Sequence, residues 1–330
     1  MNRILYSSTM TVFDAYCKKI KNDYKKDIIN KLTAMLKRVY KDRCPDYRLY
    51  AGYIQTIIDH FDLILELKME KFNLFAKDHF SYYKINFSSK KWFNYAGSND
   101  CYKDESFFET LVSEMRYNII KKNVYIPAIK DLGIRTCIYC NAEYMPVYES
   151  GRKIKARCEA DHFFPKDKYP FLCISFFNLL PSCPYCNKSK RDKPASFYLY
   201  TNNYCEISPF RFGLEEKSVI QYKLNFDAKK LKINIDSDDK RLLKNHNDCF
   251  HIENLYSSFK DEAEEIIWKS MAKNYSYMKQ LKQSYKCIFG SYGVNKIRFL
   301  YGFYEKQCDV HKRPLSKMKQ DIAKQLKILK

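Results

Sequence analysis

Four cysteines with the spacing of metal ligands frame the most informative stretch of this chain. They form two Cys-x-x-Cys pairs, Cys137/Cys140 and Cys183/Cys186. Two such pairs are typical of a four-thiolate site that holds Zn²⁺ tetrahedrally and leaves no open position. We therefore expect one structural zinc per chain, which helps to fold a segment too small to bury a core by itself. Cys158 and Cys173 lie between the pairs and are alternative ligands, but the paired spacing favours the outer four.

Between and after these pairs lie side chains that suit phosphodiester hydrolysis: Asp161, His162, Asn178 and Asn187. His162 is the natural general base, because the pKa of an imidazole lies near working pH. Asp161 and Asn187 offer the oxygen ligands that Mg²⁺ or Mn²⁺ prefers, and such a cation would polarise the phosphate. Asn178 would hold a loop by hydrogen bonds from its side chain to the backbone. Neighbours on a strand point to opposite faces, so a bend must direct Asp161 and His162 to one phosphate.

A basic cluster follows on the presumed helix after the last cysteine: Lys188, Lys190, Arg191 and Lys193. These side chains can bind backbone phosphates, and a merely solvated helix face is the alternative. The whole chain carries 59 Lys and Arg against 38 Asp and Glu, a formal net charge of +21. That excess indicates a polyanionic partner, most often nucleic acid.

The chain resembles the HNH nuclease family through motifs that occur in order: Cys137-x-x-Cys140, Asp161-His162-x-x-Pro165, Asn178-Leu179 and Cys183-x-x-Cys186-Asn187-x-x-Lys190. The resemblance implies a ββα-metal unit in its zinc-ribbon form and a metal-dependent endonuclease that cuts DNA, less often RNA. It assigns His162 as general base, Asp161 and Asn187 as ligands of the catalytic metal, and Asn178 as organiser of the loop. Asn187 stands where other members carry a histidine, and the Gly-Gly that many members carry after the Asp-His-x-x-Pro stretch is missing.

The resemblance also implies a biological role and partners. Stand-alone bacterial HNH proteins with large accessory regions look like antiphage or restriction effectors, and some, as in Septu-type systems, pair with an ATPase. We therefore expect double-stranded DNA as the substrate, and a regulatory protein such as an ATPase or a second copy of the chain as a partner. Two alternatives stay open: a zinc-ribbon module that binds nucleic acid without cutting it, and a toxin that cleaves RNA.

The periodicity of apolar residues predicts a mainly α protein with a small α+β insert. Helices are expected over residues 1–130, where Ser106 with Glu109 resembles a capping box. The nuclease unit would occupy residues 131–200, with a hairpin of Glu143–Tyr148 and Lys155–Phe164 joined at Ser150-Gly151. Residues 201–330 would open with a second hairpin and continue as helices. Its two strands would be Val219–Phe226 and Leu231–Ile235, and the last helix would span Leu315–Leu329.

The distribution of cysteines and apolar residues indicates the cellular compartment of the protein. The 13 cysteines are scattered and odd in number, which favours zinc-bound and buried thiols in a reducing cytoplasm over a disulfide framework. The first residues lack the features of a secretion signal. No run of 18 apolar residues exists, so we expect no membrane span.

The remaining histidines serve as internal comparisons. Asp59-His60-Phe61 and Asp78-His79-Phe80 repeat the Asp-His-Phe triplet in helix-like sequence without flanking cysteines, so we expect solvated surfaces there. His246 and His251 are expected on the surface. The turn His311-Lys312-Arg313 is consistent with a phosphate contact and, equally, with a solvated turn.

Overall fold

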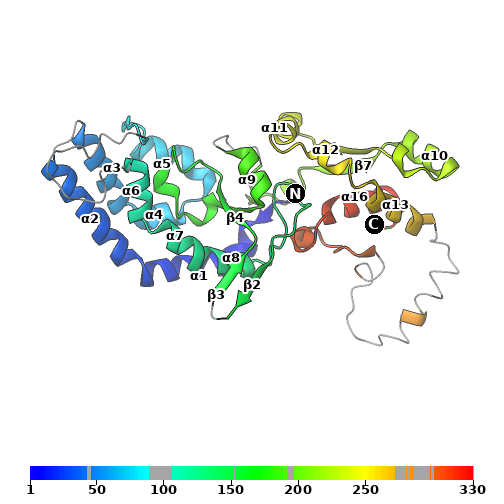
Figure 1. Ribbon diagram of the computed structural model, residues 1–330, viewed down its shortest axis with the longest axis horizontal. Helices are drawn as coiled ribbons and strands as arrows, with labels where there is room; N and C mark the ends of the chain where they lie inside the picture. Colours follow the sequence, from blue (N-terminus) through cyan, green and yellow to red (C-terminus); the bar gives the residue numbers. More distant parts are fainter. Residues whose placement is uncertain are drawn as a thin grey trace.

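The computed structural model describes residues 1–42, 46–88, 106–151, 153–191, 197–271, 280, 283–285, 298 and 301–329. It is mainly helical, and the strands within these residues pair into small two-stranded sheets. Figure 1 shows the N-terminal helices at one end, the cysteine-containing segment in the middle and the C-terminal helices at the other end. Within the described part of the chain, no helix combines the length and the apolar character that crossing a bilayer requires.

The N-terminal part is a group of helices. Its elements are α1 (Tyr6–Asp23), α2 (Lys25–Asp42), α3 (Tyr47–Asp59), α4 (Phe61–Glu66), α5 (Phe72–His79), α6 (Phe107–Glu114), α7 (Tyr117–Ile120) and α8 (Ile126–Asp131). The predicted capping box of α6 is confirmed, since Ser106 Oγ accepts from the Glu109 amide at 3.2 Å and the Ser106 amide donates to the Glu109 carboxylate at 2.7 Å. These helices pack on the loop that follows the strand with His162: Phe80 stacks on Phe171 with ring centroids 4.0 Å apart.

The central part holds two antiparallel strand pairs. They are β2 (Val147–Ser150) with β3 (Lys153–Ala156), and β4 (Glu159–His162) with β5 (Leu179–Ser182). Helix α9 (Pro184–Lys190) follows β5 almost directly. The predicted turn at Ser150-Gly151 is present, and Gly151 has the positive φ of 61° that favours glycine.

The second predicted strand, Lys155–Phe164, is two strands instead of one. Its first half pairs with β2, and its second half, β4, pairs with β5. Burial explains the division. β2 and β3 are largely exposed, whereas Ala160, Asp161 and His162 of β4 are all buried and need a partner strand in the interior.

The C-terminal part is mostly helical. Its elements are β6 (Tyr200–Thr201), which pairs in parallel with β1 (Ile4–Leu5), then β7 (Arg211–Leu214), α10 (Glu216–Asn225), β8 (Ile233–Asp236), α11 (Lys240–Phe250), α12 (Ile252–Tyr256), α13 (Lys260–Met271) and α16 (Ser316–Gln325). Asp239 caps α11 by accepting from the Leu242 amide at 2.9 Å. The last helix is shorter than expected and ends at Gln325.

The predicted hairpin of this part is wrong in its first strand, because Val219–Phe226 falls almost entirely in α10. The true partner of β8 is β7, which precedes that helix. Alternation of apolar residues misled the prediction. In α10, Ser218 and Tyr222 are buried four residues apart, while Ile220 and Leu224 are exposed and contribute little to the core.

The C-terminal part forms hydrogen bonds with the turn of the first cysteine pair and with the residue before that turn. His246 Nε2 donates to the carbonyl of Tyr139 at 2.9 Å, and Tyr256 Oη donates to the carbonyl of Cys140 at 2.7 Å. The amide of Arg135 donates to the carbonyl of His311 at 2.8 Å. His246 and His311 are therefore buried, so the expected surface position of His246 is wrong, whereas His251 is exposed.

Two of the three buried histidines, His246 and His311, lie outside the candidate site and predict a loss of stability in acid. Burial lowers the pKa of His246 and of His311 to about 3, against 6.5 for a free imidazole. The unfolded chain thus binds more protons between these values, and the free energy of unfolding falls as pH drops below about 6.5. For each histidine, we expect the free energy of unfolding to fall by up to about 1.4 kcal/mol per pH unit. Urea unfolding from neutral to acid pH measures this change. The variant His246→Gln should show a shallower pH dependence of the free energy of unfolding, by about one proton. A slope equal to that of the wild type would contradict this.

Candidate active site

Four buried thiols form a compact cluster where the two Cys-x-x-Cys pairs meet. The sulfur atoms of Cys137, Cys140, Cys183 and Cys186 all lie within 4.8 Å of one another. A tetrahedral site with Zn–S bonds of about 2.3 Å needs sulfur atoms about 3.8 Å apart, so the donor set fits zinc. The clustering of the outer four cysteines is confirmed. Cys173 instead donates to the Met115 sulfur at 3.7 Å, and none of the described cysteines is in a disulfide.

The local backbone explains why these thiols converge. Cys137 and Cys140 belong to a tight turn that is closed by a bridge between Thr136 and Tyr144 and by a left-handed Asn141, φ 52°. Cys183 caps α9 and Cys186 lies in its first turn. Backbone amides point at the sulfurs: the Cys183 amide donates to Cys137 Sγ at 3.3 Å and the Cys186 amide to Cys183 Sγ at 3.4 Å. Such donors stabilise thiolates, as a zinc site requires.

Asp161 is held on both carboxylate oxygens. Tyr139, which lies between two of the cluster cysteines, donates its hydroxyl to Oδ2 at 2.5 Å. Lys190 donates to Oδ1 at 3.0 Å and also to the carbonyl of His162 at 2.7 Å. Burial raises the pKa of Asp161, and the charge of Lys190 opposes that rise. The turn that carries the thiols is thus joined directly to the strand that carries Asp161.

His162 ends β4 and has one fixed and one available nitrogen. Its Nε2 lies 3.2 Å from the carbonyl of Cys173, and since a carbonyl only accepts, Nε2 carries the proton. Nδ1 is then unprotonated. The Nδ1 atoms of His246 and His311 are buried and have no hydrogen-bond partner. The Nδ1 atom of His162 is not among such buried, unpartnered atoms, and His162 lines a cavity. Burial, and then the charge of Lys166, lower the pKa of His162 to about 3, so the imidazole is neutral.

Asn187 lies in the second turn of α9, facing β4. Its amide nitrogen donates to the carboxylate of Glu159. This orientation leaves Oδ1 as the free end of the amide, and none of the described residues donates a hydrogen bond to it. Glu159 is a carboxylate that the sequence analysis missed, two positions before Asp161 on the same strand.

Asn178 makes hydrogen bonds of the expected kind. Its Oδ1 accepts from the Phe164 amide at 2.8 Å, and its Nδ2 donates to the carbonyls of Phe164 at 3.2 Å and Leu172 at 3.3 Å. The side chain is fully buried. It thereby fixes the loop that presents the Cys173 carbonyl to His162.

One cavity of about 310 Å³ brings together three of the predicted residues, Asp161, His162 and Asn187, whereas Asn178 does not line it. Its lining consists of Phe108, Ala160, Asp161, His162, Pro165, Lys166, Asp167, Asn187, Lys190 and Arg191. Asp161 and His162 reach the same cavity although they are neighbours on a strand, because β4 ends at His162 and the chain bends there. Three cationic side chains against two carboxylates make the cavity suitable for an anion.

The predicted basic cluster divides into different roles. Lys188 and Arg191 are exposed, and Arg191 lines the cavity. Lys190 does not fit the expected surface contact with phosphate: its side chain is 1% exposed and paired with Asp161. Lys193 lies outside the described residues. Lys166, which sequence analysis did not single out, joins Arg191 at the cavity.

The buried pair of Lys190 and Asp161 predicts a large effect on stability. Lys190→Met removes the ammonium and leaves a buried carboxylate, which should lower the free energy of unfolding by about 3–5 kcal/mol. The neighbouring Lys188→Met, at an exposed position, should change it by less than about 0.5 kcal/mol. Chemical denaturation measures both. Equal effects of the two variants would show that Lys190 is not paired as described.

The other Asp-His-Phe triplets lie apart from the thiols. His60 and His79 contact each other at the ends of α3 and α5, with ring centroids 4.2 Å apart and ring planes tilted by 48°. His60 Nδ1 donates to the carbonyl of Thr56 at 3.0 Å. Among the described residues, only the four cysteines form a cluster of metal-ligating groups. The triplet by itself therefore does not mark the site.

Comparison with known proteins gives a partial similarity. No family model matches the chain, and no solved structure matches it. A stretch of 63 residues is 36% identical to Septu protein PtuB of Bacillus thuringiensis. That stretch is 19% of this chain and covers 22% of the relative, so the match spans about a fifth of the curated protein. The similarity relates one segment of the two proteins.

Proposed function

We propose that this protein is a metal-dependent HNH-type endonuclease that hydrolyses phosphodiester bonds in DNA and serves in antiphage defence. One observation carries the proposal: Asp161, His162 and Asn187 line a single cavity with basic side chains, next to a four-thiol cluster. The similarity of one segment to Septu protein PtuB supports the defence role. The order β4, β5, α9 agrees with the strand, strand and helix of a ββα-metal unit.

The oxygen donors at this cavity suit a hard divalent cation, Mg²⁺ or Mn²⁺. A carboxylate has about four lone-pair sites, of which Tyr139 and Lys190 use two on Asp161. Asn187 offers Oδ1 because its nitrogen is turned to Glu159. When bound, such a cation supplies positive charge to the scissile phosphate and the leaving oxygen.

His162 supplies the base. With Nε2–H donating to the Cys173 carbonyl, Nδ1 takes a proton from the attacking water. The water oxygen bonds to phosphorus, and the bond between phosphorus and the leaving 3′ oxygen breaks. The negative charge of a bound phosphate raises the pKa of the imidazole from its low value in the free protein, which makes Nδ1 a stronger base. Lys166 and Arg191 hold the other phosphate oxygens by charge-assisted hydrogen bonds.

The proposed substrate is double-stranded DNA, and the proposed setting is the cytoplasm of a bacterium. A regulatory protein such as an ATPase, or a second copy of the chain, is the proposed partner. A free nuclease of this charge would endanger host DNA, so we propose that a partner restrains it.

A second candidate is a zinc-ribbon module that binds nucleic acid without cutting it. Two contacts favour it. The ion pair of Lys190 with Asp161 satisfies that carboxylate within the protein, and His162 is only 5% exposed. Such a module needs the thiol cluster and the basic surface but no base and no hard cation.

Incubation of supercoiled plasmid with purified protein distinguishes these functions. We expect nicking and linearisation with Mg²⁺ or Mn²⁺ and none with chelator. Retardation of the plasmid without cutting, under all cations and with the candidate ATPase added, would support the binding module. Degradation of tRNA with the plasmid spared would support an RNA-cleaving toxin.

A further inference from the structure

A second basic cavity lies on the outer side of the turn that carries Cys137 and Cys140. Its volume is about 260 Å³, and its lining is Arg135, Tyr144, Arg298, Tyr304, Lys312 and Arg313. Four of these side chains are cationic, two are aromatic, and none is a carboxylate. The turn Lys312-Arg313, for which the sequence left a phosphate contact open, thus contributes two of the four charges.

The frame of this cavity is fixed by backbone hydrogen bonds. Arg135 and Tyr144 flank the turn on opposite sides, where Thr136 bridges to Tyr144 and the Met145 amide donates to the Arg135 carbonyl at 2.7 Å. The Arg135 amide donates to the His311 carbonyl at 2.8 Å. The buried His311 ring is itself held by the carbonyl of Asn2 at 2.7 Å. The backbone that carries Arg135 and Tyr144 and the backbone at His311, next to Lys312, are therefore held in place before any ligand binds.

Two of the four cations at this cavity, Arg135 and Arg313, have no carboxylate partner within the described residues. Lys312 is paired with Asp309 at 2.7 Å. Arg313 donates only to the carbonyl of Gly302, at 2.5 Å. Mutual repulsion of these groups is relieved by an anion, and guanidinium groups match the geometry of phosphate. The ring of Tyr144 is 54% exposed and available for stacking.

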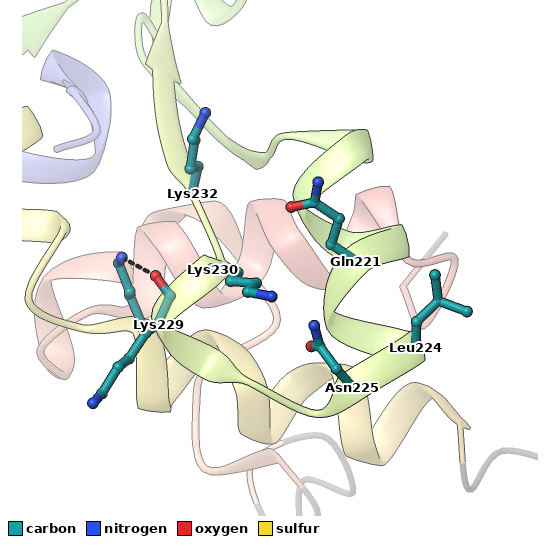
Figure 2. A pocket seen from close by; sticks show the side chains of 7 residues that line it. Gln221, Leu224, Asn225, Lys229, Lys230 and Lys232 are labelled. Atoms are coloured by element: carbon teal, nitrogen blue, oxygen red, sulfur yellow. Dashed lines mark hydrogen bonds between the residues drawn. The ribbon is translucent and has the colours of Figure 1, made fainter.

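Another basic cavity, of about 500 Å³, lies between α10 and the turn Ala228–Lys230. Figure 2 shows that Lys230 and Lys232 point in different directions there. Lys232 is paired with Glu215 at 3.2 Å, and Lys260 donates to the carbonyl of Lys229 at 2.7 Å. No aromatic side chain lines this cavity. Its lysines do not converge on one anion, so it serves as a comparison of equal charge.

We propose that the cavity of Arg135 and Arg313 binds the phosphate of a nucleotide, with the base against the exposed ring of Tyr144. The ligand is either a free nucleotide or one unit of a nucleic-acid strand, which share this chemistry. The site is separate from the cavity with His162, and binding there does not depend on hydrolysis. A volume of about 260 Å³ lies just below the usual range of ligand sites, which limits the ligand within the cavity to one nucleotide or less.

The test measures binding by fluorescence anisotropy with two probes at low salt: a ribose-labelled mononucleotide and a labelled single-stranded oligonucleotide. We expect both to bind saturably, and inorganic phosphate but not a nucleoside to compete. Arg135→Ala with Arg313→Ala should weaken binding of the mononucleotide at least about tenfold. Lys229→Ala with Lys230→Ala removes the same charge elsewhere and should change it less than about twofold. If the oligonucleotide binds more tightly than the mononucleotide, the ligand is one unit of a nucleic-acid strand. If the mononucleotide binds more tightly, the ligand is a free nucleotide.

Two results would overturn this inference: no saturable binding of either probe by folded wild-type protein, or equal weakening by the two double variants. Binding is measured without Mg²⁺ or Mn²⁺ and does not require cleavage, so a failed cleavage assay and a failed binding assay are independent outcomes. Arg135 and Arg313 are exposed, so the double variant should fold and weaker binding by it should not result from unfolding. Circular dichroism and zinc content check that the double variant is folded.

Discussion

His162→Ala should lower cation-dependent cleavage of DNA by about 10²–10⁴-fold, the usual contribution of a general base. The loss follows from the position of Nδ1, which is the only basic nitrogen that the imidazole presents to the cavity. Stability should fall by less than about 3 kcal/mol, since one buried ring with a single hydrogen bond is removed. Initial rates of plasmid nicking with Mn²⁺ measure the effect.

The chain supplies its own matched control for this variant. His79→Ala alters the same Asp-His-Phe triplet in α5, away from the thiol cluster, and should leave the nicking rate within about twofold. Cutting that persists in His162→Ala at the wild-type rate would remove His162 from the mechanism.

Loss of the zinc site should have the largest effect on folding. Purified protein is expected to contain one tightly bound zinc per chain by elemental analysis. Cys183→Ala removes a ligand at the start of α9, and we expect it to destabilise the central part by more than about 5 kcal/mol, because metal binding is folding energy there. Asn187→Ala should do the reverse, with a change in stability below about 1.5 kcal/mol and a loss of cleavage of at least about tenfold.

Cys205→Ala is the control for the cysteine variant, since Cys205 is exposed and outside the cluster. Its thermal unfolding and its zinc content should match the wild type. A folded protein without zinc, or equal destabilisation by Cys183→Ala and Cys205→Ala, would contradict a structural zinc.

The thiol cluster was predictable because ligand spacing constrains the chain locally. A Cys-x-x-Cys turn and a Cys-x-x-Cys helix start each place two sulfurs on one side, and four thiols have few other ways to be buried together. Asn178 was predictable for a similar reason, because a short amide side chain inside a loop binds nearby backbone groups.

The partners of Asp161 were not predictable from spacing. Tyr139 reaches it only because the cysteine turn folds over β4, and Lys190 reaches it because α9 packs against the same strand. Lysine side chains are exposed in most proteins. The burial of Lys190 therefore results from the packing of α9 against β4 and not from its local sequence. The same holds for His246, whose burial depends on α11 covering Tyr139.

These contacts couple the thiol cluster to the proposed cation site. Tyr139 lies between two thiol residues and donates to Asp161, so a disturbed zinc site displaces a proposed ligand of the catalytic cation. Zinc removal should therefore impair cleavage even under conditions where the helical parts remain folded.

The central claim is that Asp161 and Asn187 hold one hard cation beside Nδ1 of His162. Anomalous diffraction from crystals soaked in Mn²⁺ tests it without a partner protein or a substrate. We predict one manganese peak in the cavity, coordinated by oxygens of Asp161 and Asn187. A peak only at other sites, or an empty cavity with the Lys190–Asp161 pair unchanged at saturating Mn²⁺, would contradict the claim.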